Sequence, residues 1–174
     1  MKSKTERILT VMNVLAWIVF VGAMIDAGGD LTSWGISFWH PLAAKDLFNH
    51  LDLYALREFS VFHYSLAVLF SVAAMIMIGY TAYLVIKVLS KIKLSNPFTQ
   101  EIAQRMERIS YFLLATWILV MLKNLHTYWL QQQVPGVKVE YISGDFIFTA
   151  GVVFVFAQIF KKGVELQTEH ELTV

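Results

Sequence analysis

A lysine, an asparagine and a histidine lie close together near one end of a long apolar run, and they have the clearest chemical potential in the chain. Counted about 20 residues inward from Arg108, Lys123, Asn124 and His126 lie within the thickness of a bilayer. An ammonium group at that depth is costly, so it normally faces the interior of a helix bundle and has a partner. The pattern indicates a polar cavity, open to the outside, for a ligand, a proton or an ion. We favour a structural interpretation, in which Lys123 forms an ion pair that fixes helix packing or its stem snorkels to the interface, because a lysine can reach the interface from that depth.

Other side chains could join this polar cluster from neighbouring helices. The candidates expected at a similar depth are Asp26, Glu58, Asp145 and His63. An acidic partner would neutralise Lys123, because charges inside a membrane are stable only when they are paired or hydrated.

Histidine and cysteine usage argues against metal and enzyme chemistry. Four histidines fall toward the same expected side of the membrane: His40, His50, His63 and His126. No two have the i,i+3 or i,i+4 spacing that places two ligands on one helix face, so we predict no metal site and no cofactor. The absence of cysteine excludes disulfides, thiolate sites and quinone-linked thiol oxidation. Because no nucleophile is paired with a base, we do not expect an enzyme.

The elements that must position these side chains are membrane-spanning helices. Residues 59–86 include no charged side chain, and this run is longer than the roughly 20 residues that cross a bilayer core. Of 174 residues, 57% are hydrophobic and 16% charged, against about 25% charged in a typical soluble domain. We predict an all-α fold, a single integral membrane four-helix bundle over 1–174. Its spans are expected at about 8–27, 60–88, 109–130 and 146–160.

Glycine, proline and capping residues predict the boundaries of the first two helices. The pair Gly28-Gly29 is expected to end the first helix. The basic segment before this helix is typical of a signal peptide, but the cleavage site that would follow the apolar run is poor. We therefore expect the helix to be kept in the mature protein. In the aromatic outer loop 30–57, Pro41 favours the start of a short helix on the membrane surface. Asp52 is expected to cap the second helix, which then continues to about residue 92.

The second and third helices are expected to form a hairpin with a water-exposed tip, 89–108. The turn 95–97 ends in a proline that suits the start of a helix. On the wet face of that helix, Glu101 and Arg105 form an i,i+4 pair. The opposite face carries an apolar stripe of Phe98, Ile102, Ile109 and Leu113.

Positive charges predict the orientation in the membrane. Most fall on one side: Lys2, Lys4, Arg7, Lys87, Lys91, Lys93, Arg105, Arg108, Lys161 and Lys162. Four fall toward the other side: Lys45, Arg57, Lys123 and Lys138. The positive-inside rule therefore places both termini, the tip and the tail 161–174 in the cytoplasm.

Small residues on the second helix allow another helix to approach closely. They are Ala67, Ser71, Ala74 and Gly79, with Gly22 on the first helix. This composition serves packing within the monomer as readily as a homo-oligomer, and both alternatives stay open.

The tail carries the residues through which the chain resembles a known family. Phe160, Gly163, Leu166, Glu169, Leu172, Thr173 and Val174 fit the pattern F-x-x-G-x-x-L-x-x-E-x-x-L-T-V. A second recurrent element is matched by Asn96, Pro97 and Phe98. On these residues the chain resembles an uncharacterised family of small four-helix bacterial inner-membrane proteins, a domain of unknown function. The resemblance implies a multi-pass protein of the bacterial cytoplasmic membrane, often encoded beside a small Xre-type helix-turn-helix regulator, and it implies no activity.

The tail and the last loop also have physical interpretations. The fourth helix is expected to continue past Gly163, because nothing after it breaks a helix. The apolar end 172–174 is expected to dock on the stripe of the tip, or to add as a short strand to a partner. Alternation over 137–142 suggests a small strand.

Two functional hypotheses follow from these features. The favoured one is a non-enzymatic regulatory or interaction protein that engages a cytoplasmic partner through its tail and tip. The expected partner is the helix-turn-helix regulator, with lipid around the helices and no direct contact to nucleic acid. The alternative is a small-ligand or ion-binding sensor or transporter component that uses the outward-facing cluster of Asp26, Glu58, His63, Lys123, Asn124 and His126.

Overall fold

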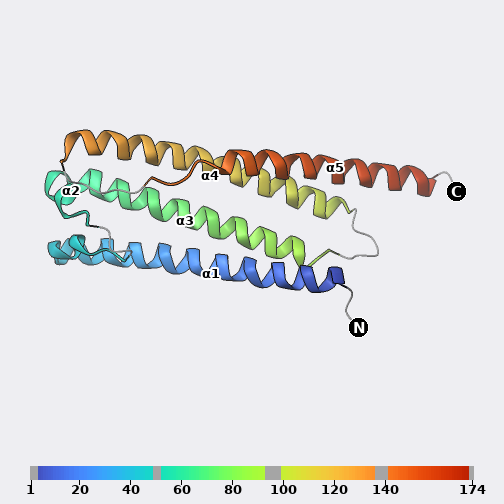
Figure 1. Cartoon of the computed structure of the whole chain (residues 1–174), viewed down its shortest axis with the longest axis horizontal. Helices are drawn as coiled ribbons and strands as arrows, with labels where there is room; N and C mark the ends of the chain where they lie inside the picture. The colour runs from blue at the N-terminus through green and yellow to red at the C-terminus, as the bar shows by residue number, and fades with distance from the viewer. Residues whose placement is uncertain (1–3, 49–51, 93–98, 136–140, 173–174) are drawn as a thin grey trace. The chain divides into compact units, whose positions relative to one another are not determined.

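The computed structural model describes residues 4–48, 52–92, 99–135 and 141–172, and most of them are helical (Figure 1). The elements are α1 (Lys4–Trp39), the short 3-10 helix η1 (Pro41–Lys45), α2 (Tyr54–Phe59), α3 (Val61–Leu89), α4 (Gln100–Gln133) and α5 (Phe146–Leu172). The described residues contain no strand, so the all-α fold class is confirmed. Most of the strand suggested over 137–142 lies outside the described residues, and residues 141 and 142 are not in a strand.

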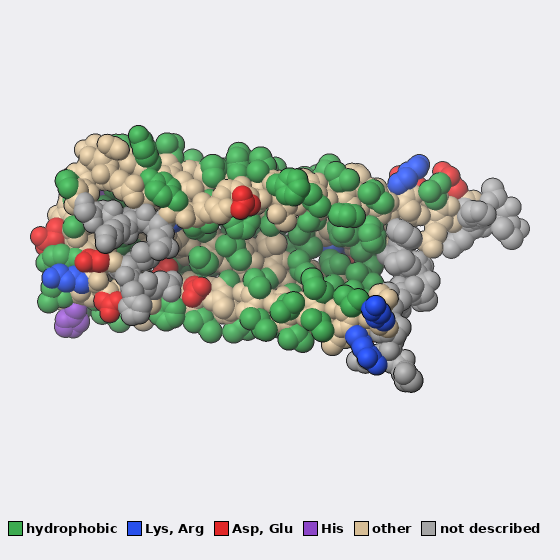
Figure 2. Space-filling model, viewed as in Figure 1, with side chains coloured by type: hydrophobic (Ala, Val, Ile, Leu, Met, Phe, Trp, Pro, Cys, Tyr) green, Lys and Arg blue, Asp and Glu red, His purple; other side chains and the backbone are tan. Residues whose placement is uncertain are grey.

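Four helices are long and apolar enough to cross a membrane, which fits a multi-pass membrane protein. They are α1, α3, α4 and the Phe146–Glu169 part of α5. The apolar windows of α1 and α5 are only 6% and 11% buried inside the protein, and Ile18 of α1 is 62% exposed. Hydrophobic side chains accordingly cover much of the visible face (Figure 2), as expected of a surface that contacts acyl chains.

α1 does not end at the glycine pair, so the prediction for this boundary is wrong. The helix passes Gly28 and Gly29 and ends at Trp39. Pro41 follows closely, and a proline disfavours helical backbone in the residue before it. Gly29 has a packing role instead, because a Cβ at this position would overlap the ring of Phe48. Glycine here permits a close approach within a regular helix.

α2 and α3 are separate helices, whereas one continuous helix was expected from residue 52 to residue 92. Ser60 lies between them in extended backbone, with φ −164° and ψ 117°. Its hydroxyl accepts a hydrogen bond from the amide of His63 (3.4 Å) and so caps α3. Asp52 accepts from the amide of Tyr54 (3.0 Å), the first residue of α2, but the N-cap position of α2 is Leu53, so Asp52 is not the cap of the long second helix that was predicted. Such side-chain bonds offer the backbone an alternative to helix continuation, which explains the break.

The short helix expected at Pro41 is the 3-10 helix η1, with the proline in its first turn. A proline suits this place because its missing N–H would have no partner there. Its position on the membrane surface stays a prediction.

α4 begins at Gln100, just after the predicted turn. The turn 95–97 and Phe98 lie outside the described residues. The hydroxyl of Thr99 accepts from the amide of Ile102 (3.3 Å) and so satisfies one of the free N–H groups at the helix start. α5 runs past Gly163 to Leu172, which confirms its expected continuation.

The chain divides into two compact units, each with its own buried cluster. Unit 1 comprises Met1–Phe20, Tyr80–Ala115 and Asp145–Val174, and unit 2 comprises Val21–Gly79 and Thr116–Gly144. The helices α1, α3 and α4 contribute to both units. The cluster of unit 1 contains Leu84, Val88, Ile102, Ile109, Leu113 and Ala150, which confirms that the described part of the predicted stripe is buried. The cluster of unit 2 includes Ala27, Leu47, Leu56, Tyr64, Val68 and Leu130.

Candidate functional site

In unit 2, α3 and α4 bring two of the predicted polar residues together. Nδ1 of His63 lies 3.3 Å from Nε2 of His126, and both residues are half-buried. One neutral imidazole can donate to the other, with the direction set by their tautomers. The separation is slightly longer than an ordinary hydrogen bond. The pair therefore connects the first turn of α3 to the last part of α4.

Aromatic rings enclose the histidine pair. Between centroids, the ring of His63 lies 5.4 Å from that of Phe62 and 4.8 Å from that of Trp129. The ring of Phe70 lies 5.8 Å from that of His126. Such aromatic contacts contribute about 0.5–1.5 kcal/mol each, so they restrict the orientation of both imidazoles. Within the described ranges, no three His, Cys, Asp or Glu side chains form a group able to hold a metal ion.

Asn124 holds the chain segment that follows α4. Its Nδ2 donates to the carbonyl oxygen of Ile142 (2.8 Å), and its Oδ1 accepts from the amide of the same residue (3.1 Å). One carboxamide thus satisfies both backbone groups of that residue, as a neighbouring strand would. Gly144 packs near Met121, whose Cε would lie 3.1 Å from a Cβ at the glycine. The Asn124 amide is therefore committed to positioning this segment.

Lys123 lies in the interior of unit 2, as expected of a charged residue in a membrane helix. It is 5% exposed, which argues against the snorkelling interpretation, because a snorkelling lysine extends along the protein surface. The residue belongs to a buried stripe of α4 that also contains Thr116, Val120, Thr127 and Leu130. The spacing of three and four residues keeps this stripe on one helix face.

Asp30 is a buried carboxylate that sequence reasoning missed. It is 7% exposed, and its Oδ1 has no hydrogen-bond partner among the described residues. Asp26, which the sequence did single out, lies one helical turn earlier on α1 and is half-buried. The i,i+4 spacing was the available signal, but it has meaning only if the helix continues through Gly28 and Gly29.

Glu58 and Asp145 have local roles at helix ends. Glu58, in α2, accepts a hydrogen bond from the hydroxyl of Tyr54 and thereby raises the pKa of that phenol. The carbonyl oxygen of Asp145 accepts from the amide (3.3 Å) and the hydroxyl (3.4 Å) of Thr149 in the first turn of α5.

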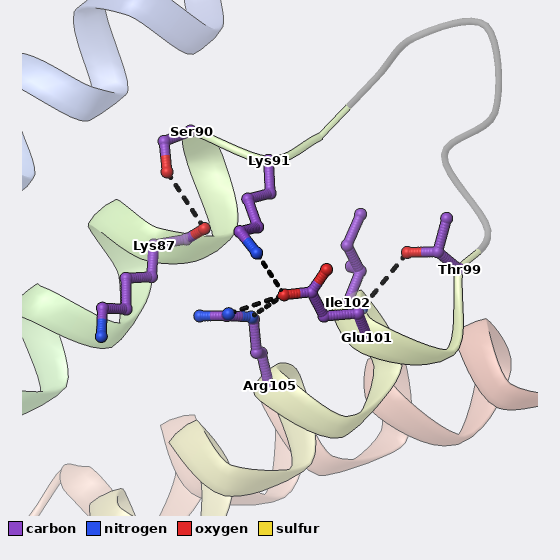
Figure 3. A network of polar contacts seen from close by, with 7 residues as sticks. All are labelled: Lys87, Ser90, Lys91, Thr99, Glu101, Ile102 and Arg105. Carbon is purple, nitrogen blue, oxygen red and sulfur yellow. Dashed lines mark hydrogen bonds and ion pairs between the residues drawn. The ribbon is translucent and has the colours of Figure 1, made fainter.

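In unit 1, charged side chains join the end of α3 to the start of α4 (Figure 3). Lys91 and Arg105 both donate to Oε1 of Glu101, and Arg105 does so through Nη2 at 2.7 Å and Nε at 3.2 Å. The predicted i,i+4 pair is confirmed. Lys87, one turn before Lys91, directs its ammonium over the ring of Tyr83, 4.3 Å from the centroid.

Residues 160 and 161, at the start of the tail, anchor α5 within unit 1. Phe160 packs against the unit 1 cluster, and the ammonium of Lys161 pairs with Glu107 of α4 (2.7 Å). Gly163 is half-buried.

The helix beyond this anchor, residues 163–172, is called the α5 extension. Residues 165–169 are all exposed, including Glu169, and Leu166 is 54% exposed. This stretch therefore does not dock on the tip. The side chain of Leu172 lies outside the described part of the chain, as do Thr173 and Val174, so docking through 172–174 stays a prediction.

Comparison with known proteins gives a family and no activity. No curated protein and no solved structure matches the chain. A family model described as a protein of unknown function, DUF2975, matches residues 8–174. That match reaches from the first turns of α1 to the end of α5 and so includes all four span-capable helices. The chain therefore belongs to the DUF2975 family of proteins of unknown function.

Proposed function

We propose that this chain is a non-enzymatic regulatory or interaction protein of a bacterial inner membrane, which holds a cytoplasmic partner through the α5 extension and the tip 89–108. One observation carries the proposal: α5 stays helical to Leu172 while Leu166 is 54% exposed. An apolar side chain on a free helix is a common anchor for a groove in a partner protein.

The charges of the α5 extension support a location in water. Glu165 of the extension pairs with Lys162, which directly precedes the extension (2.9 Å), and Glu169 is exposed. Charged residues are costly in a bilayer core, so this end of α5 belongs in the aqueous phase. The positive-inside rule makes that phase the cytoplasm.

The partner that we propose is a small helix-turn-helix regulator of transcription. The family resemblance motivates this choice, since such a regulator is often encoded beside members. The membrane protein would sequester or release the regulator and would not itself bind nucleic acid. A homo-oligomer that shares the α5 extension is the competing occupant.

The test compares variants of the full chain in gently solubilised membranes containing the neighbouring helix-turn-helix regulator. The intact chain is expected to retain the regulator, whereas Leu166→Ser and a deletion of 172–174 are expected to lose it. Gln167→Ala, an exposed change on the same helix, serves as the matched control and should retain it. Equal retention by all four chains, or no retention by the intact one, would refute the proposal.

A second candidate function, binding of a small ligand or ion, is favoured by the burial of opposite charges within unit 2. Lys123 is 5% exposed and Asp30 7% exposed, and buried charges in membrane proteins are often functional. Lys123→Met would abolish such binding while leaving retention of the regulator intact. Growth or transport phenotypes that survive this substitution would count against the second candidate.

A further inference from the structure

The side chains at the junction of α3 and α4 have more positive than negative charge. Lys91 and Arg105 both pair with a single carboxylate, that of Glu101 (Figure 3), while the ammonium of Lys87, one turn earlier, points away from it and over Tyr83. The other described ion pairs of unit 1 are one-to-one: Lys161 with Glu107 and Lys162 with Glu165. At the junction, cations therefore outnumber carboxylates, whereas in the other two pairs one cation meets one carboxylate.

Donor groups at the junction remain available for an anion. A guanidinium has five N–H donors and an ammonium three. Arg105 uses Nε and Nη2, and Lys91 uses its ammonium, on the same oxygen of Glu101. Further donors of both residues have no partner within the described ranges, and the side chains of Lys91 and Glu101 are each 51% exposed. These donors could bind an incoming phosphate, whose negative charge would then compete with the Glu101 carboxylate for the two cations.

The junction is built on a well-packed frame. Ile102 and Val88 belong to the buried cluster of unit 1, with Ile92 packed against it, and Thr99 caps the first turn of α4. The cations are held by helix ends whose backbone is positioned by this packing. A preorganised set of donors loses less entropy on binding than a flexible loop would.

We expect the junction to lie at the level of the lipid phosphates. α3 is a span-capable helix that ends at Leu89, and α4 begins at Gln100. Lys87 lies in the last turn of α3 with its ammonium over Tyr83, and tyrosine and lysine are typical of the headgroup layer. Basic clusters next to a membrane span attract anionic lipids.

We propose that Lys91 and Arg105, supported by Lys87, form a binding site for the headgroup phosphate of an anionic phospholipid, and that Glu101 competes with this phosphate. The carboxylate holds the two cations in place when no lipid is bound. This inference does not depend on a protein partner, because it concerns lipid alone.

The test measures lipid retention by the purified full chain in nanodiscs of phosphatidylcholine with a minor fraction of phosphatidylglycerol. Wild type is expected to prefer phosphatidylglycerol, and the double variant Lys91→Gln/Arg105→Gln to lose the preference. Each removed cation should weaken binding about fivefold, which corresponds to about 1 kcal/mol. Glu101→Gln should strengthen binding, because it removes the competing carboxylate.

Control variants distinguish a specific lipid-binding site from the general attraction of anionic lipids to positive charge. Lys162→Gln removes another exposed lysine, which is paired on α5, and it should leave the preference unchanged. Lys91→Arg keeps the charge and should keep the preference, even if the double variant is poorly folded. Inorganic phosphate is expected not to displace the lipid. A preference that Lys162→Gln weakens as much as the double variant does, weaker binding by Glu101→Gln, or displacement by inorganic phosphate would overturn the proposal.

Discussion

At the scale of single residues, unit 2 contains buried polar groups whose free-energy cost must be offset by the packing of aromatic and aliphatic side chains. Asp30 illustrates this, because it combines burial with an oxygen that has no partner among the described residues. A buried polar group without a hydrogen bond costs free energy, and a buried charge costs more. Asp26 on the preceding turn adds a like charge when both are ionised. Proteins generally retain such groups for a role other than stability.

We expect Asp30→Asn to stabilise the protein. The amide keeps the shape of the side chain but removes the cost of burying a negative charge. A gain of about 1 kcal/mol would raise the unfolding temperature in detergent by roughly 2–4 °C, as followed by circular dichroism. Asp26→Asn, at a half-buried position of the same helix, is the matched control and should shift it less. A lower unfolding temperature for Asp30→Asn would show that its charge is stabilising.

At the scale of elements, adjacent glycines on α1 have different surroundings. Gly28 has nothing within 4 Å of a Cβ built on it, whereas a Cβ at Gly29 would overlap the ring of Phe48. The two positions share one helix and a regular backbone. The effect of a side chain at Gly28 therefore depends on helix propensity alone, whereas at Gly29 it depends mainly on packing against Phe48.

The paired substitutions Gly28→Ala and Gly29→Ala are expected to have opposite effects. Alanine at Gly28 should stabilise α1 by up to about 1 kcal/mol, because alanine has the higher helix propensity. At Gly29, alanine should destabilise the protein by about 1–3 kcal/mol, since the Phe48 ring has to move. Thermal unfolding of both variants in the same detergent measures the difference. Equal effects would mean that Phe48 is free to rotate away at little cost.

The elements also show where sequence reasoning works and where it fails. Apolar runs predict that four helices are able to cross a membrane, because length and composition decide this property. The ends of α1 and α3 were mispredicted because Gly29 and Ser60 respond to local contacts, with Phe48 and with the His63 amide. The sequence predicts that His63 lies at a similar depth to His126, but their direct contact could not be predicted, since it depends on how α3 and α4 rotate against each other in unit 2.

At the scale of the whole molecule, four span-capable helices should return the chain to the side of the membrane on which it began. From the positive-inside rule we predict that this side is the cytoplasm. The chain has no native cysteine, so a single introduced cysteine reports its own location without a background.

Cysteine labelling in intact cells tests this topology. Thr168→Cys, on the exposed α5 extension, should react with a membrane-impermeant maleimide only after the membrane is permeabilised. Gln132→Cys, exposed at the end of α4, should react in intact cells. A reversed pattern would show that the orientation is opposite to the one predicted. If both cysteines reacted from the same side, α5 would not cross the membrane between them.

Both units are discontinuous in sequence, and this has a consequence for how the protein is made. The second half of α1 leaves the ribosome early, yet Trp34 reaches its hydrogen-bond partner Ser65 (3.0 Å) only after α3 has begun to emerge. Unit 2 can be completed only when residue 144 has been synthesised, and unit 1 only when α5 is available. During translation α1 therefore inserts before its packing partners exist, so assembly in the membrane is finished late, with the arrival of the last helix.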